Sequence, residues 1–447
     1  MYRAAARRRT AAARQRGQAL VLVLAFAAVL VGTLLVALEA GRAATRQQRL
    51  VNAADAAAYG AASWQARTLN AQAYMNRAIV ANEVAIAQAV SLRSWSEYLR
   101  RTLANVRTLT SAVPYLGAAT QSLASAWGAA DRTVQVSARA VEAGASSVEA
   151  ILSGAQEAVN ALGPVAAGEI ARATLRAVSP DVGVSAEHGR LEAANALEWA
   201  RFTASYSGPQ RDRLRATVLE ARDGFTRGRS HRVNTGPLSP LLRVEKRGGT
   251  ELVGYSAWRA LDTLSIHQRR AVLFGSFRER APVGWSGAED GRPAAWTRGD
   301  HDGTWRVNPA ASTLADRSLV LQGRAPFYAG LPATRDVREP WRRDERRLAY
   351  AVEAEHREPA AAALAGLRVP SLPAPSGRAR DLARERPRVR ALAAAVVEFD
   401  RPEPRADGRR EYPSLYSPYW RARLAPVTAG QRLTVRGALD PFVAVAP

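Results

Sequence analysis

The 447-residue chain contains no cysteine. Disulfide bonds, thiolate metal sites and a cysteine nucleophile are therefore excluded, because each of them needs a thiol. Lysine is nearly absent as well, since Lys246 is the only one among 63 basic residues. The lack of cysteine leaves the compartment open, because a chain of this length can build its core without disulfides.

Sequence motifs of several enzyme classes are also missing. No GxSxG, GxxxxGK[ST] or GxGxxG pattern occurs, so the sequence lacks the signatures of α/β-hydrolases, P-loop nucleotide-binding proteins and Rossmann folds. None of the five histidines pairs with another at HxxxH spacing. The best local cluster of potential cation ligands is Asp300, His301 and Asp302 within the sequence GDHDG. A bound cation is one interpretation, and an ordinary polar turn is the other.

Proline is absent from the first 113 residues, which are rich in helix-forming Ala, Leu, Gln, Glu and Arg. We therefore expect helix over most of this stretch. Within it, residues 18–38 (QALVLVLAFAAVLVGTLLVAL) carry no charge. As a helix rising about 1.5 Å per residue they would measure about 31 Å, close to the roughly 30 Å hydrocarbon core of a bilayer. This run is predicted to be a transmembrane helix.

The length of this run predicts that it is retained as an anchor, and the residues on either side of it predict its orientation. Its length exceeds the about 7 to 15 apolar residues of a secretory signal, which favours an anchor that is retained. Six arginines precede it and three follow, namely Arg42, Arg46 and Arg49. The positive-inside rule then places residues 1–17 in the cytoplasm as a basic tail and the rest of the chain outside. The expected location is the inner membrane, with a single span.

Two regions are expected beyond the anchor. Residues 39–206 are Ala-rich and predicted to be helical, with Pro164 and Pro180 dividing the part after Ser111 into two or three helices. Residues 207–447 gain Gly, Pro, Trp and Arg and are predicted to be mixed α/β. The expected fold class is α+β, with one N-terminal transmembrane helix continuing into the Ala-rich helical region.

Short apolar runs between turn signals predict the strands of the C-terminal region. A hairpin is expected at Gly248-Gly249, because two glycines can supply the positive φ of a tight turn. The predicted strands are Leu241–Glu245, Glu251–Tyr255, Arg270–Phe277, Leu319–Gln322, Arg347–Val352 and Ala394–Phe399. The aromatic run Glu411–Trp420 is expected to pack into the core.

Positive charge is concentrated in the C-terminal half. Residues 201–447 hold 43 basic and 27 acidic residues, which accounts for +16 of the net +23. Residues 369–390 (VPSLPAPSGRARDLARERPRVR) are predicted to form a basic, Pro-bearing loop. The arginines are scattered, so we expect no specific nucleic acid to bind. An anionic lipid, an envelope polysaccharide, an acidic protein or simply water remain alternatives for the basic surface.

Three elements near the anchor together resemble a known family. They are Arg16-Gly17-Gln18-Ala19-Leu20 at its entry, Leu38-Glu39-Ala40-Gly41-Arg42 at its exit, and LVNAADAAA from Leu50 to Ala58. In this order and spacing they are similar to the TadE/TadG-like proteins of Flp (tight adherence) pilus assembly. The resemblance covers about residues 14–62.

The resemblance implies a single-span envelope protein that helps to assemble, anchor or display a pilus without catalysis or a cofactor. Its implied partners are membrane lipid and other pilus-assembly or envelope proteins, in an assembly of unspecified oligomeric state. Glu39 and Arg42 lie one helical turn apart, as do Asn52 and Asp55, so each pair shares a face. These four are candidate helix-contact residues, and a solvated helix face is the alternative.

Pilin-like processing is the point at which the sequence departs from a pilin. Such proteins are cut after a glycine and carry Glu at the fifth mature position. A cut after Gly17 would put Leu22 there. Cleavage at Gly17 and incorporation into a filament are therefore both disfavoured. A second hypothesis is an anchored, metal-dependent enzyme whose site lies in residues 207–447, and a third is an anchored nucleic-acid binder.

Overall fold

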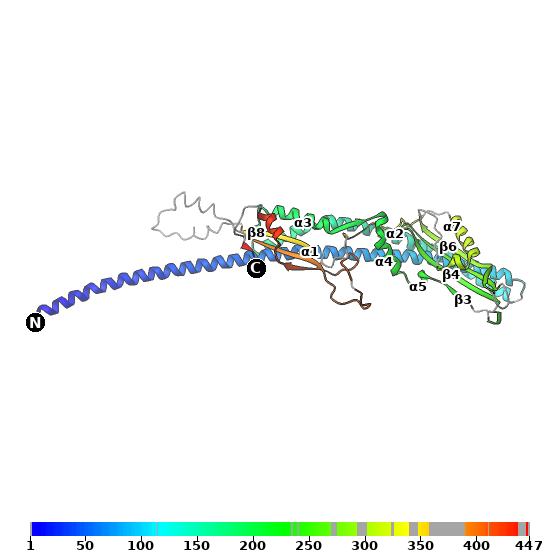
Figure 1. Cartoon of the computed structure of the whole chain (residues 1–447), viewed down its shortest axis with the longest axis horizontal. Helices are drawn as coiled ribbons and strands as arrows, with labels where there is room; N and C mark the ends of the chain where they lie inside the picture. The colour runs from blue at the N-terminus through cyan, green and yellow to red at the C-terminus, as the bar shows by residue number, and fades with distance from the viewer. Residues whose placement is uncertain are drawn as a thin grey trace.

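Two long helices form the frame of the protein. The computed structural model describes residues 2–113, 115–233, 236–238, 241–269, 275–292, 302–322, 326–338, 347–356, 389–409, 411–436 and 444–445. Helix α1 (Tyr2–Thr110) runs without interruption for 109 residues, and α2 (Leu116–Val178) turns back along it. Figure 1 shows the N-terminal part of α1 projecting far from the folded body. The predicted α+β class, with a long N-terminal apolar helix, is confirmed.

Helix α2 is a single helix, so the prediction of two or three helices is wrong. Pro164 lies inside it and has no N–H to donate to the carbonyl of Asn160. The indole of Trp199 donates to that carbonyl at 3.0 Å instead. Gly163 makes room for the indole, because a Cβ there would lie 2.8 Å from the ring. A residue that is distant in sequence therefore satisfies the carbonyl that the proline leaves free.

The first sheet lies against the part of α1 nearest the anchor. Its antiparallel order is β1 (Val182–Val184), β8 (Leu348–His356), β9 (Arg390–Phe399) and β10 (Trp420–Ala425), and β11 (Ala444–Val445) pairs in parallel with β9. One face of the sheet shares a core with the alanines of α1 and with α2. The other face is covered by α3 (His188–Phe202) and α9 (Ala429–Arg436). The central strands β8 and β9 are therefore buried on both faces, whereas the edge strand β10 is largely exposed after Trp420.

The second sheet lies farther along α1, as Figure 1 shows. Its antiparallel order is β3 (His231–Val233), β4 (Leu242–Val253), β5 (Ala257–Arg269) and β6 (Phe277–Gly291). It packs between α1 and α7 (Pro309–Gln322). The remaining elements are β2 (Thr203–Tyr206) paired with β7 (Thr334–Val337), α4 (Asp212–Ala221), α5 (Gly224–Arg227), α6 (Thr304–Val307) and the 3₁₀ turns η1 (Gly208–Arg211) and η2 (Gly236–Leu238).

Several strand predictions can be compared with these sheets. The strands expected at Arg347–Val352 and Ala394–Phe399 are confirmed within β8 and β9. The strand expected at Leu319–Gln322 is wrong, because these residues end α7. Of Arg270–Phe277, only residues 275–277 are described, and Phe277 begins β6.

The hairpin expected at Gly248-Gly249 is also wrong, because β4 runs straight through both glycines. The chain turns later, at Gly254, which has φ of 61°. Gly248 lies opposite Asp262 in the neighbouring strand β5. A Cβ on Gly248 would lie 2.3 Å from the carboxylate of Asp262. Glycine is therefore required at position 248 because a side chain would collide with Asp262, and not because the chain turns there.

Asp262 is the centre of a buried ion cluster. Its side chain is fully buried and accepts hydrogen bonds from Lys246 at 2.6 Å, Arg229 at 3.0 Å and Ser94 of α1 at 2.7 Å. Lys246, the only lysine, also lies over the ring of Tyr98 at 4.5 Å from its centroid. Burying a carboxylate requires such partners. The cluster ties the second sheet to α1.

Replacement of Gly248 by alanine tests this explanation. The new methyl group would push apart Asp262 and Lys246, and we expect Gly248→Ala to lower the free energy of unfolding by about 2 to 4 kcal/mol. Denaturant unfolding of the full chain in detergent, followed by tryptophan fluorescence, measures this. Gly128→Ala is the matched control, because Gly128 lies in α2 with open space around it and the change should be neutral or slightly stabilising. Equal stability of the two variants would show that the cluster does not need the glycine.

Candidate functional site

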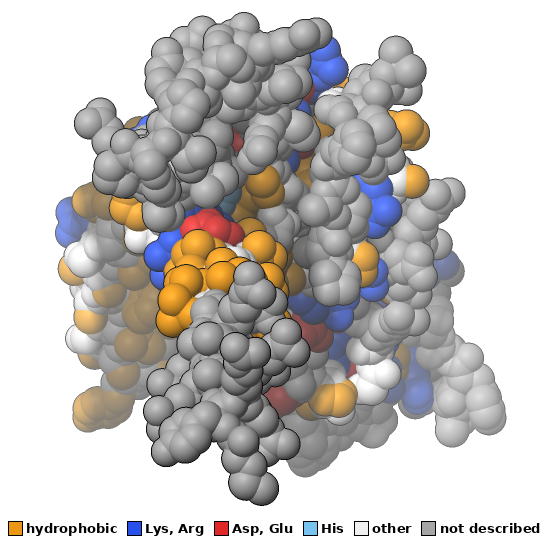
Figure 2. Space-filling model, turned by 90° about the vertical axis from the view of Figure 1, so that its left-hand side faces the viewer, with side chains coloured by type: hydrophobic (Ala, Val, Ile, Leu, Met, Phe, Trp, Pro, Cys, Tyr) orange, Lys and Arg blue, Asp and Glu red, His pale blue; other side chains and the backbone are white. Residues whose placement is uncertain are grey.

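The N-terminal part of α1 has the length and composition of a membrane-spanning helix. Residues 19–38 are apolar, and each of their side chains is exposed. Among the described residues, α1 is the one helix long and apolar enough to cross a membrane. Figure 2 looks at the molecule from this end, where hydrophobic side chains gather on the helix that faces the viewer. An apolar surface on all sides of a helix is what a bilayer requires.

Glu39 and Arg42 lie where the apolar run ends. The guanidinium of Arg42 donates to the carboxylate of Glu39 at 2.8 Å. Both side chains are substantially exposed, so the pair contributes at most about 1 kcal/mol to stability. The structure brings the two predicted residues together, and their contact with another helix stays a prediction.

Asn52 and Asp55 lie one turn apart beside the alanine segment of α1. Asn52 is exposed and Asp55 is half-buried, and partial burial raises the pKa of Asp55. The alanines between and after them are fully buried, namely Ala53, Ala54, Ala57, Ala58, Ala61 and Ala62. They pack against the first sheet and α2 of the same chain. The close approach that alanine permits is thus used within the chain, while a role for Asn52 and Asp55 in contacts with another helix stays a prediction.

Polar side chains of α1 hold the C-terminal aromatic segment. The amide of Asn76 donates to the carbonyls of Leu415 at 2.6 Å and Arg335 at 2.8 Å, and accepts from Gln156 of α2 at 2.6 Å. Asn70 exchanges two hydrogen bonds with the backbone of Trp420, each of 3.0 Å. Leu415 and Trp420 are buried whereas Tyr412 is exposed, so the prediction that this aromatic run packs into the core is confirmed for its second half.

These polar residues were not identified as buried from the sequence, although their spacing along the helix indicates it. Among the apolar side chains of this part of α1, Tyr74 and Leu92 are exposed. The buried positions are instead spaced three or four apart through Asn76, Ile79, Glu83, Ile86 and Val90. The heptad-like spacing therefore includes polar residues, which a purely apolar criterion omits.

Two carboxyl groups meet in the seam between α1 and α2. Glu83 is fully buried and accepts hydrogen bonds from Trp258 at 2.8 Å and from Tyr328 at 2.9 Å. Glu149 of α2 is buried beside it and shares a hydrogen bond with it. Burial raises the pKa of both groups, and the nearby Glu83 raises the pKa of Glu149 further. A hydrogen bond between two carboxyl groups needs one proton, which we assign to Glu149.

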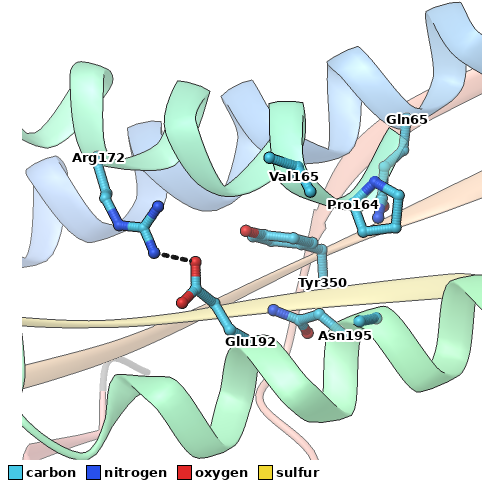
Figure 3. A pocket seen from close by; sticks show the side chains of 8 residues that line it. Gln65, Pro164, Val165, Arg172, Glu192, Asn195 and Tyr350 are labelled. Atoms are coloured by element: carbon cyan, nitrogen blue, oxygen red, sulfur yellow. Dashed lines mark hydrogen bonds and ion pairs between the residues drawn. The ribbon is translucent and has the colours of Figure 1, made fainter. Parts of the chain in front are cut away.

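A cavity of about 280 Å³ lies between α1, α2, α3 and β8 (Figure 3). Arg172 and Glu192 form an ion pair at one end, and Gln65 lies at the other. Both amide atoms of Gln65 are buried and lack a hydrogen-bond partner among the residues that the structure describes. The cavity is large enough for a few water molecules, which would satisfy this amide.

The residues proposed as cation ligands are only partly within the described structure. Asp300 and His301 lie outside the described residues, and Asp302 adopts φ of 58° in a turn. In the described part of the chain, no group of three or more His, Asp or Glu side chains could hold a metal ion. A cation at this loop stays a prediction. Residues 369–388 of the predicted basic loop also lie outside the described residues, and Arg390 begins β9.

Comparison with known families places the anchor in context. Residues 17–66 match the family model described as putative Flp pilus-assembly TadE/G-like. The N-terminal region is TadE/G-like. Neither a curated protein nor a solved structure matches the chain. The match confirms the resemblance seen in the sequence, and it supports involvement in Flp pilus assembly.

The TadE/G-like segment spans two environments. It includes the apolar anchor, the Glu39–Arg42 pair, Asn52 and Asp55, and the buried alanines. The family element therefore joins the apolar segment of α1 to the core of the folded body within one helix.

The carboxyl pair predicts how stability depends on pH. In the unfolded chain both groups lose their protons near pH 4.5, whereas the folded chain retains one because its pKa is raised. The folded state then binds more protons, so the free energy of unfolding should fall as pH rises from about 5 towards 8, by on the order of 1 to 3 kcal/mol. Thermal unfolding of the full chain in detergent at both pH values measures this fall.

Glu149→Gln is the diagnostic variant. Its neutral amide can donate to Glu83 at any pH, so the fall in stability between pH 5 and pH 8 should shrink. Glu169→Gln is the control, because Glu169 lies in an exposed ion pair on the same helix and its removal should leave the pH profile unchanged. A profile that is identical in wild type and Glu149→Gln would contradict the shared proton.

Proposed function

We propose that the protein is a non-enzymatic, single-pass envelope protein that assembles, anchors or displays Flp-type pilus components through protein contacts. The observation that carries the proposal is the TadE/G-like match over residues 17–66, which lies on a helix that is both membrane anchor and core element. The basic tail of residues 1–17 lies in the cytoplasm, and the two sheets lie outside it.

The continuity of α1 supports a mechanical role. No turn or linker separates the apolar run from the buried alanines, since α1 is helical from Tyr2 to Thr110. A helix of 109 residues rising about 1.5 Å per residue is roughly 160 Å long. The anchor and the outer region therefore move together, so the chain can hold a partner at a fixed height and rotation relative to the membrane.

The distribution of ion pairs supports protein contacts rather than phosphate binding. Many arginines of the outer region bind carboxylates of the same chain, including Arg259 with Glu289, Arg335 with Glu157 and Arg423 with Glu398. Such arginines are neutralised locally and are not available to phosphates. The 27 acids of residues 201–447 can neutralise at most 27 of the 43 basic residues there, so the ion pairs reduce the positive surface without removing it, and the lack of a specific nucleic-acid partner is part of the proposal.

The absence of cysteine allows a direct test of topology. We expect Ser122→Cys, at an exposed site of α2, to react with a membrane-impermeant maleimide in intact cells stripped of their outer barrier. Ala13→Cys, in the basic tail, should react only after the membrane is permeabilised. Both variants start from a chain without any background thiol. Labelling in the reverse order would contradict the proposed orientation.

Pilus assembly itself is the second readout. Deletion of the protein should reduce surface pili, counted by electron microscopy, and the full chain should restore them. A truncated chain that lacks residues 1–38 should fail to restore them, because it cannot enter the membrane. Normal piliation without the protein would show that the proposed function is wrong.

A further inference from the structure

The outward side of α2 carries a long uncharged face that nothing in the described structure covers. Its residues fall at three heptad positions between 140 and 165, and eleven of the twelve are exposed and one is half-buried. We call this the α2 face, and it consists of Ala140, Val141, Gly144, Ser147, Val148, Ile151, Gly154, Ala155, Ala158, Ala161, Leu162 and Val165.

The charged residues near the α2 face lie away from it. The charged residues in this stretch are Glu142 and Glu149, which are buried against α1, and Glu157, which pairs with Arg335. None of them belongs to the face. Its large side chains are strongly exposed, with 70% of Ile151 and 66% of Val165 accessible to solvent. A contiguous apolar surface of this kind marks a docking site.

The spacing of the face indicates that its occupant is a helix. Val141, Gly144, Val148, Ile151, Ala155, Ala158, Leu162 and Val165 follow one another at alternating steps of three and four residues. This is the a/d seam of a coiled coil. The neighbouring position is filled by Ala140, Ser147, Gly154 and Ala161, and such small residues let a second helix approach closely.

We propose that the α2 face binds the α2 face of a second copy of this chain, as a parallel helix pair outside the membrane. The parallel direction rests on the proposed function, because two copies anchored through α1 in one bilayer point the same way. Both α2 helices then run back towards the membrane at the same height. Each residue of the face therefore meets its own counterpart.

A parallel symmetric pair restricts which residues its interface can contain, because each residue meets its own counterpart. In a parallel symmetric pair, a charged residue on the seam would face an identical charge and repel it. The α2 face contains no charged residue over its 26-residue length from Ala140 to Val165. A partner of different sequence would impose no such restriction. The charge pattern therefore favours a second copy.

The size of the face is sufficient for a weak, specific pair. The exposed fractions of its five largest side chains range from 42% to 70%. With the small residues they offer roughly 600 Å² per copy, or about 1,200 Å² in total, at the lower end of specific interfaces. Confinement of both copies to one membrane raises their effective concentration and assists a weak contact.

Single cysteines in the full-length chain, expressed in its native membrane, test the proposal. We expect Gly144→Cys and Val165→Cys each to form a disulfide-linked dimer under mild oxidation. These two sites lie about 31 Å apart along the helix, so an antiparallel pair could cross-link at one of them but not at both. Dimer at both sites supports the parallel arrangement, and dimer at only one overturns it.

The matched control is Ala150→Cys, next to Ile151 but at an exposed position off the seam. It should give several-fold less dimer than Ile151→Cys. Equal cross-linking of the two would indicate random collision and overturn the proposal. Adding Ile151→Arg to Gly144→Cys should abolish the dimer, since two arginines would then face one another, while an unchanged yield would also overturn it.

The same samples separate this inference from the proposed function. Maleimide labelling of each cysteine reports whether the variant is in the membrane with α2 outside. Correct labelling without dimer rejects the helix pair and leaves the proposed function intact. Protein found in the soluble fraction, or labelled from the wrong side, rejects the anchored topology itself.

Discussion

One unbroken helix runs from the apolar anchor segment through the middle of the folded body, and the other elements are arranged around it. In the bilayer α1 must be apolar on every side, and residues 19–38 meet this requirement. Beyond Arg49 two sheets and α2 surround the same helix, so most of its faces are buried by the rest of the chain. Alanine suits the buried part of α1, because its small side chain allows a sheet and a second helix to pack closely against α1.

A helix lined only by alanine and aliphatic residues could slide along its neighbours or rotate. Two buried polar groups of α1, Asn76 and Arg93, oppose such a movement, because each is hydrogen-bonded to partners at one position along the helix. Asn76 binds two backbone carbonyls of the outer region, and Arg93 donates to both oxygens of the buried Glu142. Moving α1 by one residue would leave these groups unsatisfied at a cost of several kcal/mol. The polar contacts set the register, and the apolar contacts provide most of the stability.

The sequence allowed the anchor, the long helix and the α+β class to be predicted, since these depend on local composition and periodicity. The failures arose where a distant residue changed the meaning of a local signal. Pro164 leaves the carbonyl of Asn160 without its helical donor, and Trp199 supplies a donor from elsewhere in the chain. Gly248 suggested a turn, but a side chain at this position would collide with the carboxylate of Asp262, and this collision explains the glycine.

The same distinction holds for the candidate site. Residues 39, 42, 52 and 55 could be placed on helix faces from spacing alone, and the Glu39–Arg42 pair is present. The carboxyl pair of Glu83 and Glu149 could not be predicted, because it depends on how two antiparallel helices are aligned. Hairpin alignment is set by the turn after Thr110 and by contacts along the whole seam. No local pattern in either helix encodes it.

The arrangement of helices also constrains what happens in the membrane when two copies pair. Packed helices lie about 8 to 10 Å apart, and α2 lies between α1 and the proposed second copy. Two α1 helices joined through a pair of α2 helices are then held up to about 30 Å apart. The anchors cannot touch one another along their length in that geometry. Glu39 and Arg42, which form an exposed ion pair where the apolar run ends, are then too far from their counterparts in the second copy to contact them.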